Sequence, residues 1–562
     1  MTSNPAFPHA YPDGFRGVFR HDLNARALYS EGAGIARTMP LAVAVPEDSE
    51  DLGQLIRWAR AEGLSLTPRG SGSGMAAGAV SSGVIVDLTR FSRLDQPDTG
   101  ARTIRSQVGV SGGQVSKALN AAGLRMPVNP SSLPFCTIGG MASTNASGSR
   151  SLRFGSTRRW VEGLHCVFDD GSDAWIRRGK PLPEHIPAVK RLSALLEAAK
   201  SHLSENNSLK LSDLRHSGVR KNSSGYGLAE ALTAEGHLVD LLVGSEGTLA
   251  FFTEVELAAI PIAGSIATVL ATFASLEEAT FCATETEATG ASACELLDRS
   301  FLDVAARGGP TGVPAHAEAV LLIEIEGSSS DECRSNLERC AELCRKHGAI
   351  FVATASDPDK AESLWKLRHA ASPILATLSP RLRSMQFIEE GCVPPHNFPA
   401  YVRGVREALS RFETPGVVFG HAGDAHAHVN PLVDTTRADW RVKARALLNT
   451  VVELTAKLGG TISGEHGDGR LRASLLPKIW SPVALAAFAN VKSAADPTCL
   501  FNRGCKLLPG DTDLIPPEDD PFGEVRHDPR VPALPPEVRA ILDEVERTRG
   551  WHRHRLDLLP GA

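Results

Sequence analysis

Three stretches of small residues, each closing a strand-like region, constrain the fold more than any other feature of this sequence. The first is 69–74, the second runs from 130 to 148, and the third is 243–249. Glycine lets a backbone approach an anion closely, and successive N–H groups in such a turn form a nest for phosphate oxygens. A long dinucleotide that lies extended against backbone needs several such stretches. The sequence therefore predicts a dinucleotide site built from all three.

The first stretch, Arg69-Gly70-Ser71-Gly72-Ser73-Gly74, differs from two common phosphate-binding motifs. It lacks the lysine of G-x-x-x-x-G-K-[ST], and no helix with an acidic residue about twenty positions further on follows it. We therefore expect neither a P-loop nor a nicotinamide-binding Rossmann domain. Taken alone, the stretch is also compatible with a flexible turn, but its two companions favour a cofactor site.

A second group of chemically versatile residues lies far downstream. Residues 419–430 contain three histidines and an aspartate, and residues 463–470 contain the pair Glu465-His466. Imidazole and carboxylate together suit Zn²⁺, Mn²⁺ or Fe²⁺ better than a metal that prefers thiolates. A lone histidine is usually structural, but this grouping in glycine-rich surroundings predicts a divalent metal site.

Bulk properties exclude several classes of protein. A chain of 562 residues exceeds what one hydrophobic core supports, so two or three domains are expected. Its formal charge of −6 provides no basic footprint for nucleic acid. There is no apolar run of about 18 residues, no secretory signal at the start, and no C-x-x-C pair among the ten cysteines. A reduced, cytoplasmic protein is expected, with peripheral membrane contact left open.

Hydrophobic periodicity predicts the order of elements. Residues 41–90 read as a strand, a helix from Asp48 to Ala61 that Ser49 or Asp51 caps, and two further strands. Residues 129–155 are expected to hold little regular structure. Residues 268–297 and 319–355 each read as a β-α-β unit, and the pair predicts a ferredoxin-like domain. The proline- and charge-rich tail after Pro509 is expected to be a loosely ordered extension over the surface.

The three small-residue stretches, in this order, resemble the FAD-binding domain of the vanillyl-alcohol-oxidase-type flavoproteins, and the resemblance covers most of residues 37–508. This fold is shared with the glycolate-oxidase flavin subunit and D-lactate dehydrogenases. The resemblance implies an α+β chain: a PCMH-type FAD-binding domain of two subdomains, followed by a ferredoxin-like α+β cap for the substrate. The implied boundaries are an N-terminal extension (1–36), the FAD-binding domain (37–263), the cap with the metal site (264–480), a segment returning to the FAD domain (481–510) and a proline-rich tail (511–562).

The resemblance also implies which residues bind the cofactor. The first stretch would hold the pyrophosphate, the second would line the path from adenine to flavin, and the third would close over it. The residues implied are Arg69, Gly70, Ser71, Gly72, Ser73, Gly74, Pro130, Gly139, Gly140, Ser143, Asn145, Gly148, Glu246 and Gly247. Some relatives attach flavin through a histidine in the first stretch. Here that stretch has neither histidine nor cysteine, so non-covalent FAD is expected.

The histidine cluster resembles the metal site of D-2-hydroxyglutarate and D-lactate dehydrogenases. That resemblance implies that His421, His428 and Glu465 bind a divalent metal (Zn or Mn) and that His466 is the catalytic base. It places Asn430 against the substrate. One departure is clear: the family commonly has Gly-Asn-Leu at 425–427, where this chain has Ala-His-Ala. The extra imidazole, His426, is either a further ligand or a substrate selector.

A 2-hydroxy acid also needs a cation for its carboxylate, and a guanidinium offers two parallel hydrogen bonds. Trp365-Lys366-Leu367-Arg368 resembles the W-x-x-R segment that serves this purpose in the family, so Arg368 is the expected contact. Arg381 and Arg383 are candidates for a distal carboxylate. Arg470 is a candidate because it follows the Glu-His pair.

The resulting functional hypothesis is an FAD-dependent, metal-assisted dehydrogenase that oxidises a D-2-hydroxy acid of the D-lactate or D-2-hydroxyglutarate type. Hydride would pass from C2 to flavin N5. The alternatives are a glycolate oxidase flavin subunit, a sugar or lactone oxidase on the same flavin fold, and a flavin-free metal- or ligand-binding protein. Electrons would leave to a separate acceptor, which is a quinone, a cytochrome, an electron carrier or oxygen. The sequence leaves the oligomeric state open.

Overall fold

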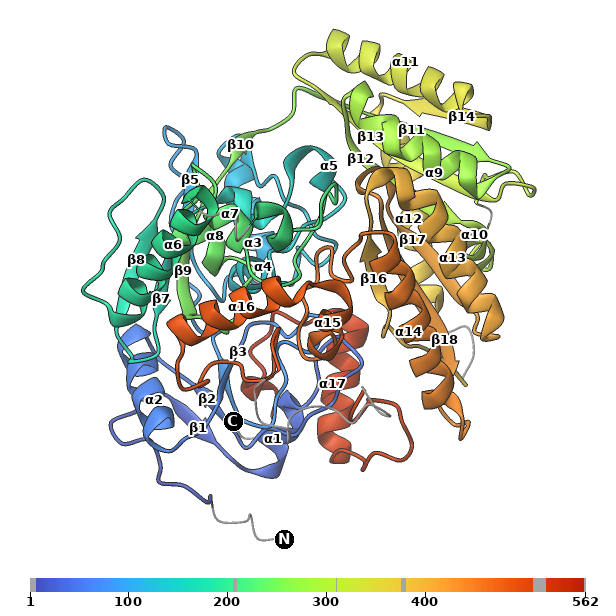
Figure 1. Ribbon diagram of the computed structural model, residues 1–562. Coiled ribbons are helices and arrows are strands. Elements are labelled where there is room, and N and C mark those ends of the chain that lie inside the picture. Colours follow the sequence, from blue (N-terminus) through green and yellow to red (C-terminus); the bar gives the residue numbers. More distant parts are fainter. Residues whose placement is uncertain (1–6, 206–209, 310, 376–380, 509–521, 560–562) are drawn as a thin grey trace.

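The computed structural model describes residues 7–205, 210–309, 311–375, 381–508 and 522–559. Two α+β domains lie side by side, with the last segments of the chain returning to the first domain (Figure 1). This arrangement confirms the predicted fold class. Among the described residues, no helix combines the length and the apolar character needed to cross a bilayer.

The FAD-binding domain is built from two four-stranded sheets. In the first, the order is β1-β2-β4-β3: β2, β4 and β3 run parallel and β1 is antiparallel to β2. The second is antiparallel, in the order β5-β9-β7-β8. The strands are β1 (Val18–Arg20), β2 (Ala42–Val45), β3 (Leu66–Arg69), β4 (Val84–Asp87), β5 (Thr103–Gln107), β7 (Val161–Val167), β8 (Asp173–Arg177) and β9 (Phe251–Ala258), with the short pair β6 (Leu124–Arg125) and β10 (Ile260–Pro261) beside them.

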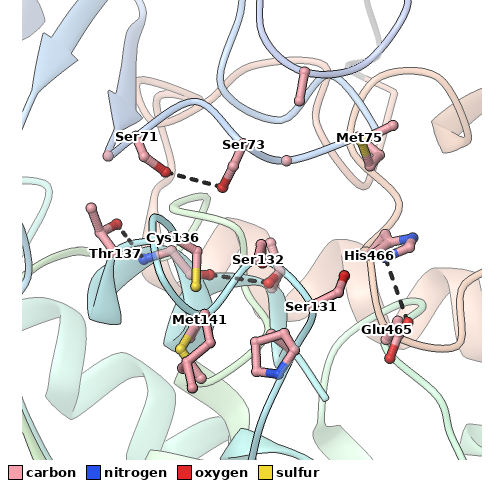
Figure 2. A pocket seen from close by; sticks show the side chains of 18 of the residues that line it. Ser71, Ser73, Met75, Ser131, Ser132, Cys136, Thr137, Met141, Glu465 and His466 are labelled. Atoms are coloured by element: carbon pink, nitrogen blue, oxygen red, sulfur yellow. Dashed lines mark hydrogen bonds and ion pairs between the residues drawn. The ribbon is translucent and has the colours of Figure 1, made fainter. Parts of the chain in front are cut away.

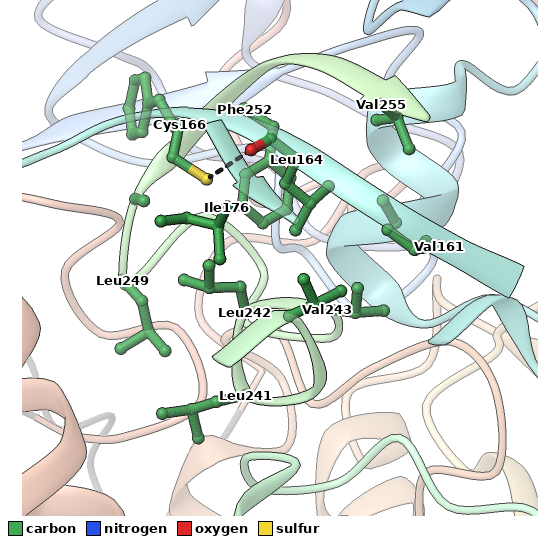
Figure 3. Close-up of a cluster of buried hydrophobic side chains, with 14 of the residues drawn as sticks. Val161, Leu164, Cys166, Ile176, Leu241, Leu242, Val243, Leu249, Phe252 and Val255 are labelled. Carbon is green, nitrogen blue, oxygen red and sulfur yellow. Dashed lines mark hydrogen bonds between the residues drawn. The ribbon is translucent and has the colours of Figure 1, made fainter. Parts of the chain in front are cut away.

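The helices of this domain are α1 (Leu23–Tyr29), α2 (Ser49–Ala61), α3 (Gly112–Ala121), α4 (Ile138–Thr144), α5 (Ser151–Phe154), α6 (Pro187–Glu205), α7 (Leu228–Ala231) and α8 (Leu238–Leu242). Figure 3 shows how the second sheet forms its core: Leu164 of β7 and Ile176 of β8 lie above Leu242 of α8, and Val161 lies near Val243. Burying one such aliphatic side chain stabilises a fold by about 1.5–3 kcal/mol. Residues of both sheets and of α8 thus belong to one apolar core, which supports the small-residue stretches.

Two local expectations need correction. The N-cap of α2 is Asp48, whose carboxylate accepts from the Asp51 N–H at 2.9 Å, so neither Ser49 nor Asp51 caps the helix. Residues 129–155 contain two helices, α4 and α5. Thr137 caps the start of α4, and Asn145 ends it in the left-handed region at φ 52°. These two caps stabilise a short helix. The sequence did not predict it, because its small residues are typical of loops.

The cap is organised around an antiparallel eight-stranded sheet. Its first four strands have the order β14-β11-β13-β12, which is the ferredoxin-like arrangement that the two β-α-β units predict. β17 and β18 extend the sheet beyond β12, and β15 and β16 both pair with β18. The strands are β11 (Ser265–Phe273), β12 (Ala291–Asp298), β13 (Ala319–Gly327), β14 (Ala349–Ala355), β15 (Leu382–Ser384), β16 (Glu389–Cys392), β17 (Gly416–His421) and β18 (His426–Asp434).

Helices cover both faces of the cap sheet. One apolar cluster joins it to α9 (Leu276–Glu285), α11 (Ser330–Lys346), α13 (Phe398–Arg411) and α14 (Trp440–Lys457). A smaller one joins the other face to α10 (Arg299–Ala306) and α12 (Pro358–Leu375). After the cap, α15 (Leu476–Ile479) and α16 (Pro482–Ala495) pack into the core of the FAD-binding domain. The return therefore begins at Leu476, slightly before residue 481.

The tail after Pro509 also differs from expectation. Residues 509–521 lie outside the described residues, but 522–559 form an ordered segment with helix α17 (Pro536–Thr548), which lies beside α1 (Figure 1). Val538 and Leu542 of α17 pack against Tyr29, Val43 and Ile85. Apolar residues at helical spacing thus anchor a segment whose proline content suggested loose order.

Candidate active site

A single cavity of about 980 Å³ is shared by the two domains. The three small-residue stretches line one part of it, and β12, β16, β17, β18 and the loop that carries Glu465 line the other. Figure 2 shows Ser71 and Ser73 of the first stretch above Cys136 and Ser132 of the second stretch, while Met75 and His466 lie together on the other side of the view. The predicted cofactor residues and the predicted chemical group therefore meet in one space.

Most of the predicted cofactor residues line this cavity. They are Arg69, Gly70, Ser71, Gly72, Ser73, Gly74, Pro130, Gly139, Gly140, Ser143, Gly148, Glu246 and Gly247. Gly72 shows why glycine is needed: its φ is +75°, and a Cβ there would lie 2.5 Å from a nitrogen of the Arg69 guanidinium. Three separate backbone segments thus line one elongated cavity, which is the arrangement that an extended dinucleotide fits.

Two predicted residues have a different role. The Arg69 guanidinium is buried and donates to the carbonyl oxygens of Tyr29, Glu31 and Ala79, so it braces the first stretch from behind instead of meeting a phosphate. Asn145 does not line the cavity: it is the C-cap of α4, and its Oδ1 accepts from the Arg158 N–H at 2.8 Å. In the structure, both side chains therefore make contacts that support the scaffold.

The predicted metal ligands converge at the other end of the cavity. The Nε2 atoms of His421 and His428 each lie 3.2 Å from Oε1 of Glu465 and 3.5 Å from each other. Metal–ligand bonds of roughly 2.0–2.1 Å place tetrahedral ligand atoms about 3.3 Å apart. The three donor atoms therefore already have the spacing that a divalent ion requires. All three side chains are buried and line the cavity.

Polar neighbours hold each of these ligands in place. Glu295 lies directly opposite His421 in the β12–β17 ladder, and its carboxylate is hydrogen-bonded to His421 Nδ1. The other oxygen of Glu465 accepts from Lys221 at 2.8 Å and from Ser147 at 2.9 Å. Burial would raise the pKa of Glu465, but the charges of Lys221 and His421 hold it well below its usual range. A carboxylate partner on a ligating histidine is the usual outer support of protein metal sites.

His466 projects toward the same group from the loop after α14. Its Nδ1 lies 2.6 Å from Oε2 of Glu389, which leaves Nε2 for the cavity. Glu390 accepts from the backbone N–H groups of Glu465 and His466, and Arg472 neutralises Glu389 and Glu390 from behind. Burial lowers the pKa of His466, but Glu389 and Glu390 outweigh this and raise it to about 10. Without a cation nearby, this imidazole is therefore protonated at neutral pH and cannot accept a further proton. A cation bound beside it would shift the balance toward the neutral base.

Arg368 and Asn430 complete the cap side of the cavity. Nε of Arg368 donates to Glu295 at 2.6 Å, and its guanidinium lies 4.8 Å from the centre of the Phe419 ring. Asn430 lies beside Gln386, with Nε2 of Gln386 3.4 Å from its Oδ1. Among the predicted alternatives, Arg381, Arg383 and Arg470 do not line the cavity. Arg470 instead donates to backbone carbonyls of Ala77 and Gly78, below the first stretch.

The extra imidazole, His426, belongs to the structural layer behind the ligands. It is fully buried, it does not line the cavity, and its Nε2 lies 2.9 Å from Oε2 of Glu390. Burial, the largest cause, lowers its pKa to about 3, so the ring is neutral. His426 nevertheless lies close enough to His421, His428 and Glu465 to form a four-residue group with them.

Sequence reasoning missed Lys221, Glu295, Glu389, Glu390 and Arg472. Each acts on a residue far away in the chain, and the sheet register is what brings Glu295 and Glu390 opposite His421 and His428. Only Glu295 had a usable signal, since it is a charged residue in the middle of a strand whose immediate neighbours, Cys294 and Leu296, are apolar.

Comparison with known proteins agrees with this architecture. Residues 40–176 match the FAD binding domain, and residues 263–505 match the C-terminal domain of the FAD linked oxidases. Glycolate oxidase subunit GlcD of Bacillus subtilis is 27% identical over 489 residues, covering 86% of this chain and 93% of that protein. D-lactate dehydrogenase of Archaeoglobus fulgidus is 28% identical over 466 residues, covering 82% and 90%.

D-2-hydroxyglutarate dehydrogenase of Pseudomonas putida is 26% identical over 533 residues, which cover 90% of this chain but 52% of that longer protein. Among solved structures, alkyldihydroxyacetonephosphate synthase superimposes with a TM-score of 0.58 at 14% identity, covering 86% of this chain and 81% of that one. This last likeness concerns the fold alone. Since the chain carries an FAD binding domain and a C-terminal domain of the FAD linked oxidases, in this order and around one shared cavity, it is an FAD-dependent oxidoreductase.

Proposed function

We propose that this protein oxidises a D-2-hydroxy acid to the 2-keto acid, with non-covalently bound FAD and a divalent metal ion, Zn²⁺ or Mn²⁺, held by His421, His428 and Glu465. The observation that carries the proposal is the shared cavity, which joins the glycine-rich stretches to the ligand group and to Arg368. The similarity to D-lactate and D-2-hydroxyglutarate dehydrogenases supports the same reaction class and the D configuration. Electrons then leave to a separate acceptor.

The residues that line the cavity have separate roles in the proposed oxidation of the alcohol group. Nε2 of His466 accepts the hydroxyl proton, and Glu389 stabilises the imidazolium that results. Arg368 binds the substrate carboxylate, and Asn430 positions the substrate beside it. FAD, held by the three small-residue stretches, would supply the acceptor for the hydride that leaves C2. A divalent cation, when bound, supplies Lewis-acid stabilisation for the negative charge that develops on the oxygen.

The charges at the cap end favour a substrate with an uncharged side chain. Of the described residues that line this end, Arg368 carries the only guanidinium, while Glu295, Glu324, Glu389 and Glu465 contribute carboxylates. Trp365 and Phe419 add two aromatic rings. A second substrate carboxylate would face like charge without a partner, which costs binding energy. We therefore favour the D-lactate type over the D-2-hydroxyglutarate type.

This preference gives a quantitative prediction. The kcat/KM for D-lactate or D-2-hydroxybutyrate should exceed that for D-2-hydroxyglutarate by about tenfold or more. A factor of ten corresponds to about 1.4 kcal/mol of binding free energy, and one unpaired like-charge contact costs at least that much. Steady-state rates with an artificial acceptor measure it. A preference for the dicarboxylate would mean that Arg381 or Arg383 reaches the substrate.

Arg368 offers a second test of the proposal. Replacing Arg368 by Ala should raise KM about 10–100-fold with a smaller change in kcat, since a charge-assisted contact to the substrate is lost throughout the reaction. Arg383→Ala is the matched control, because this exposed arginine lies on β15 outside the cavity and should leave KM unchanged. Equal effects of the two substitutions would reject the role given to Arg368.

Product analysis tests the reaction itself. Anaerobic mixing with one candidate acid should reduce the flavin and yield one equivalent of the matching keto acid per FAD. Glycolate belongs in the panel as the second candidate substrate, because of the similarity to glycolate oxidase subunit GlcD. Flavin that is reduced by sugars or lactones and by none of the hydroxy acids would establish the remaining alternative.

A further inference from the structure

The C-terminal segment, residues 522–559, lies beyond the part of the chain that matches the FAD-linked oxidase domains, which ends at residue 505. Three of its residues, Glu546, Arg549 and Trp551, nevertheless line the 980 Å³ cavity. The two family domains therefore do not enclose this cavity by themselves. The added segment supplies part of its wall.

The segment is anchored to both domains, so this wall has a fixed position. On the FAD side, Leu542 and Leu556 join the apolar cluster around Tyr29, and Arg539 pairs with Glu31 at 2.8 Å. On the cap side, Phe522 and Val525 belong to the apolar cluster of the cap. Asp528 accepts from the Arg441 guanidinium at 2.9 Å. These contacts bind the segment across the junction between the domains.

A short chain of contacts connects the segment to the first glycine-rich stretch. Arg526 pairs with Glu546 and donates to the carbonyl of Gly32 at 3.0 Å. Ala33, which follows Gly32 in the chain, donates its N–H to the carbonyl oxygen of Gly72 at 2.9 Å. The end of α17 is thus attached to the very stretch whose backbone N–H groups suit a pyrophosphate.

The charges of the cavity make Arg549 distinctive. Three arginines line the cavity: Arg69, Arg368 and Arg549. The guanidinium of Arg69 donates to backbone carbonyl oxygens, and that of Arg368 pairs with Glu295. Within the described part of the chain, the Arg549 side chain has no hydrogen bond or ion pair. Without Arg549, a pyrophosphate beside the first stretch would find no guanidinium available to pair with it. Trp551, which is only 8% exposed, adds a flat apolar surface next to it.

We propose that Arg549 and Trp551 are cofactor-binding residues, with Arg549 pairing with the pyrophosphate of FAD and Trp551 packing against the dinucleotide. Guanidinium is the side chain best matched to phosphate oxygens, and indole offers a large stacking surface. The inference concerns FAD, which the family assignment supports, and does not depend on the proposed substrate or metal.

The backbone at Arg549 allows a clean test. Its φ is +54°, the left-handed conformation that ends α17 and that glycine adopts most easily. Arg549→Gly therefore removes the guanidinium without straining the helix end. Arg547→Ala is the matched control: this neighbouring arginine is exposed, pairs with Glu544 and does not line the cavity.

The experiment measures FAD release from the purified holoprotein by the rise in flavin fluorescence, in the absence of substrate. Arg549→Gly should raise the dissociation constant for FAD about tenfold or more, and Trp551→Ala should do the same, whereas Arg547→Ala should match the unmodified protein. Trp551 is buried, and its removal also affects the packing of the segment. The result for Arg549→Gly therefore decides whether the segment binds FAD. FAD held as tightly by Arg549→Gly as by Arg547→Ala would overturn the proposal. Failure of the unmodified, FAD-loaded protein to oxidise any hydroxy acid would instead count against the proposed function and would leave the role of Arg549 intact.

Discussion

Replacing His466 by Ala should slow reduction of the flavin by substrate about 10²–10⁴-fold while FAD and metal stay bound. The effect is this large because a positioned general base contributes that range to the rate, and the described residues place no second unligated imidazole on the cavity wall. Stopped-flow absorbance under anaerobic conditions measures the rate, and flavin and metal content are determined on the same sample.

His347→Ala is the control for this substitution. His347 forms a similar imidazole–carboxylate pair with Glu285 at 3.2 Å, but on the cap surface, away from the cavity. Its removal should leave the rate of flavin reduction unchanged. If substrate reduced the flavin of the His466→Ala variant at the normal rate, another group would have to be the base. Glu389 would then be the nearest candidate.

Replacing His428 by Ala should lower bound divalent metal and substrate oxidation together. His428 supplies one of three donor atoms lying 3.2–3.5 Å apart, and loss of a direct ligand weakens a site more than the 10–100-fold typical of an outer partner. Elemental analysis after dialysis against a fixed free-metal concentration measures occupancy. FAD content should not change, because His428 lies on the cap.

His426→Gln distinguishes the two adjacent histidines. Gln keeps a donor for Glu390, and His426 does not line the cavity, so metal should stay bound. The opposite pattern, with metal kept by His428→Ala and lost from His426→Gln, would make His426 the ligand. The proximity of His426 to the other three residues makes this a real alternative.

The features predicted from sequence are those with a local signature. The first small-residue stretch follows strand β3 as expected, whereas the third follows helix α8 and precedes β9. The ferredoxin-like sheet follows from hydrophobic runs of the right length at 268–297 and 319–355. The histidines of β17 and β18 were recognisable because they lie close together in the chain. By contrast, Glu295 reaches His421 and Arg368 only through the register of the cap sheet, which the sequence does not display.

Residues whose roles depend on neighbours far along the chain were also misjudged. Arg69 resembles a phosphate ligand in sequence, but Tyr29 and Glu31 occupy its guanidinium. The C-terminal segment looked loosely ordered because of its prolines, although Val538, Leu542 and Val545 have the spacing of an amphipathic helix. In that case the signal was present, and the composition of the surrounding residues concealed it.

In the proposed function, hydroxy-acid oxidation requires a divalent metal ion bound by His421, His428 and Glu465. The most direct measurement is anaerobic reduction of the bound FAD by D-lactate, before chelation, after chelation with metal loss verified, and after Zn²⁺ or Mn²⁺ is restored. We expect rapid bleaching of the yellow flavin, loss of this bleaching after chelation, and its recovery once metal is restored. Bleaching that proceeds unchanged in verified metal-free protein would contradict it.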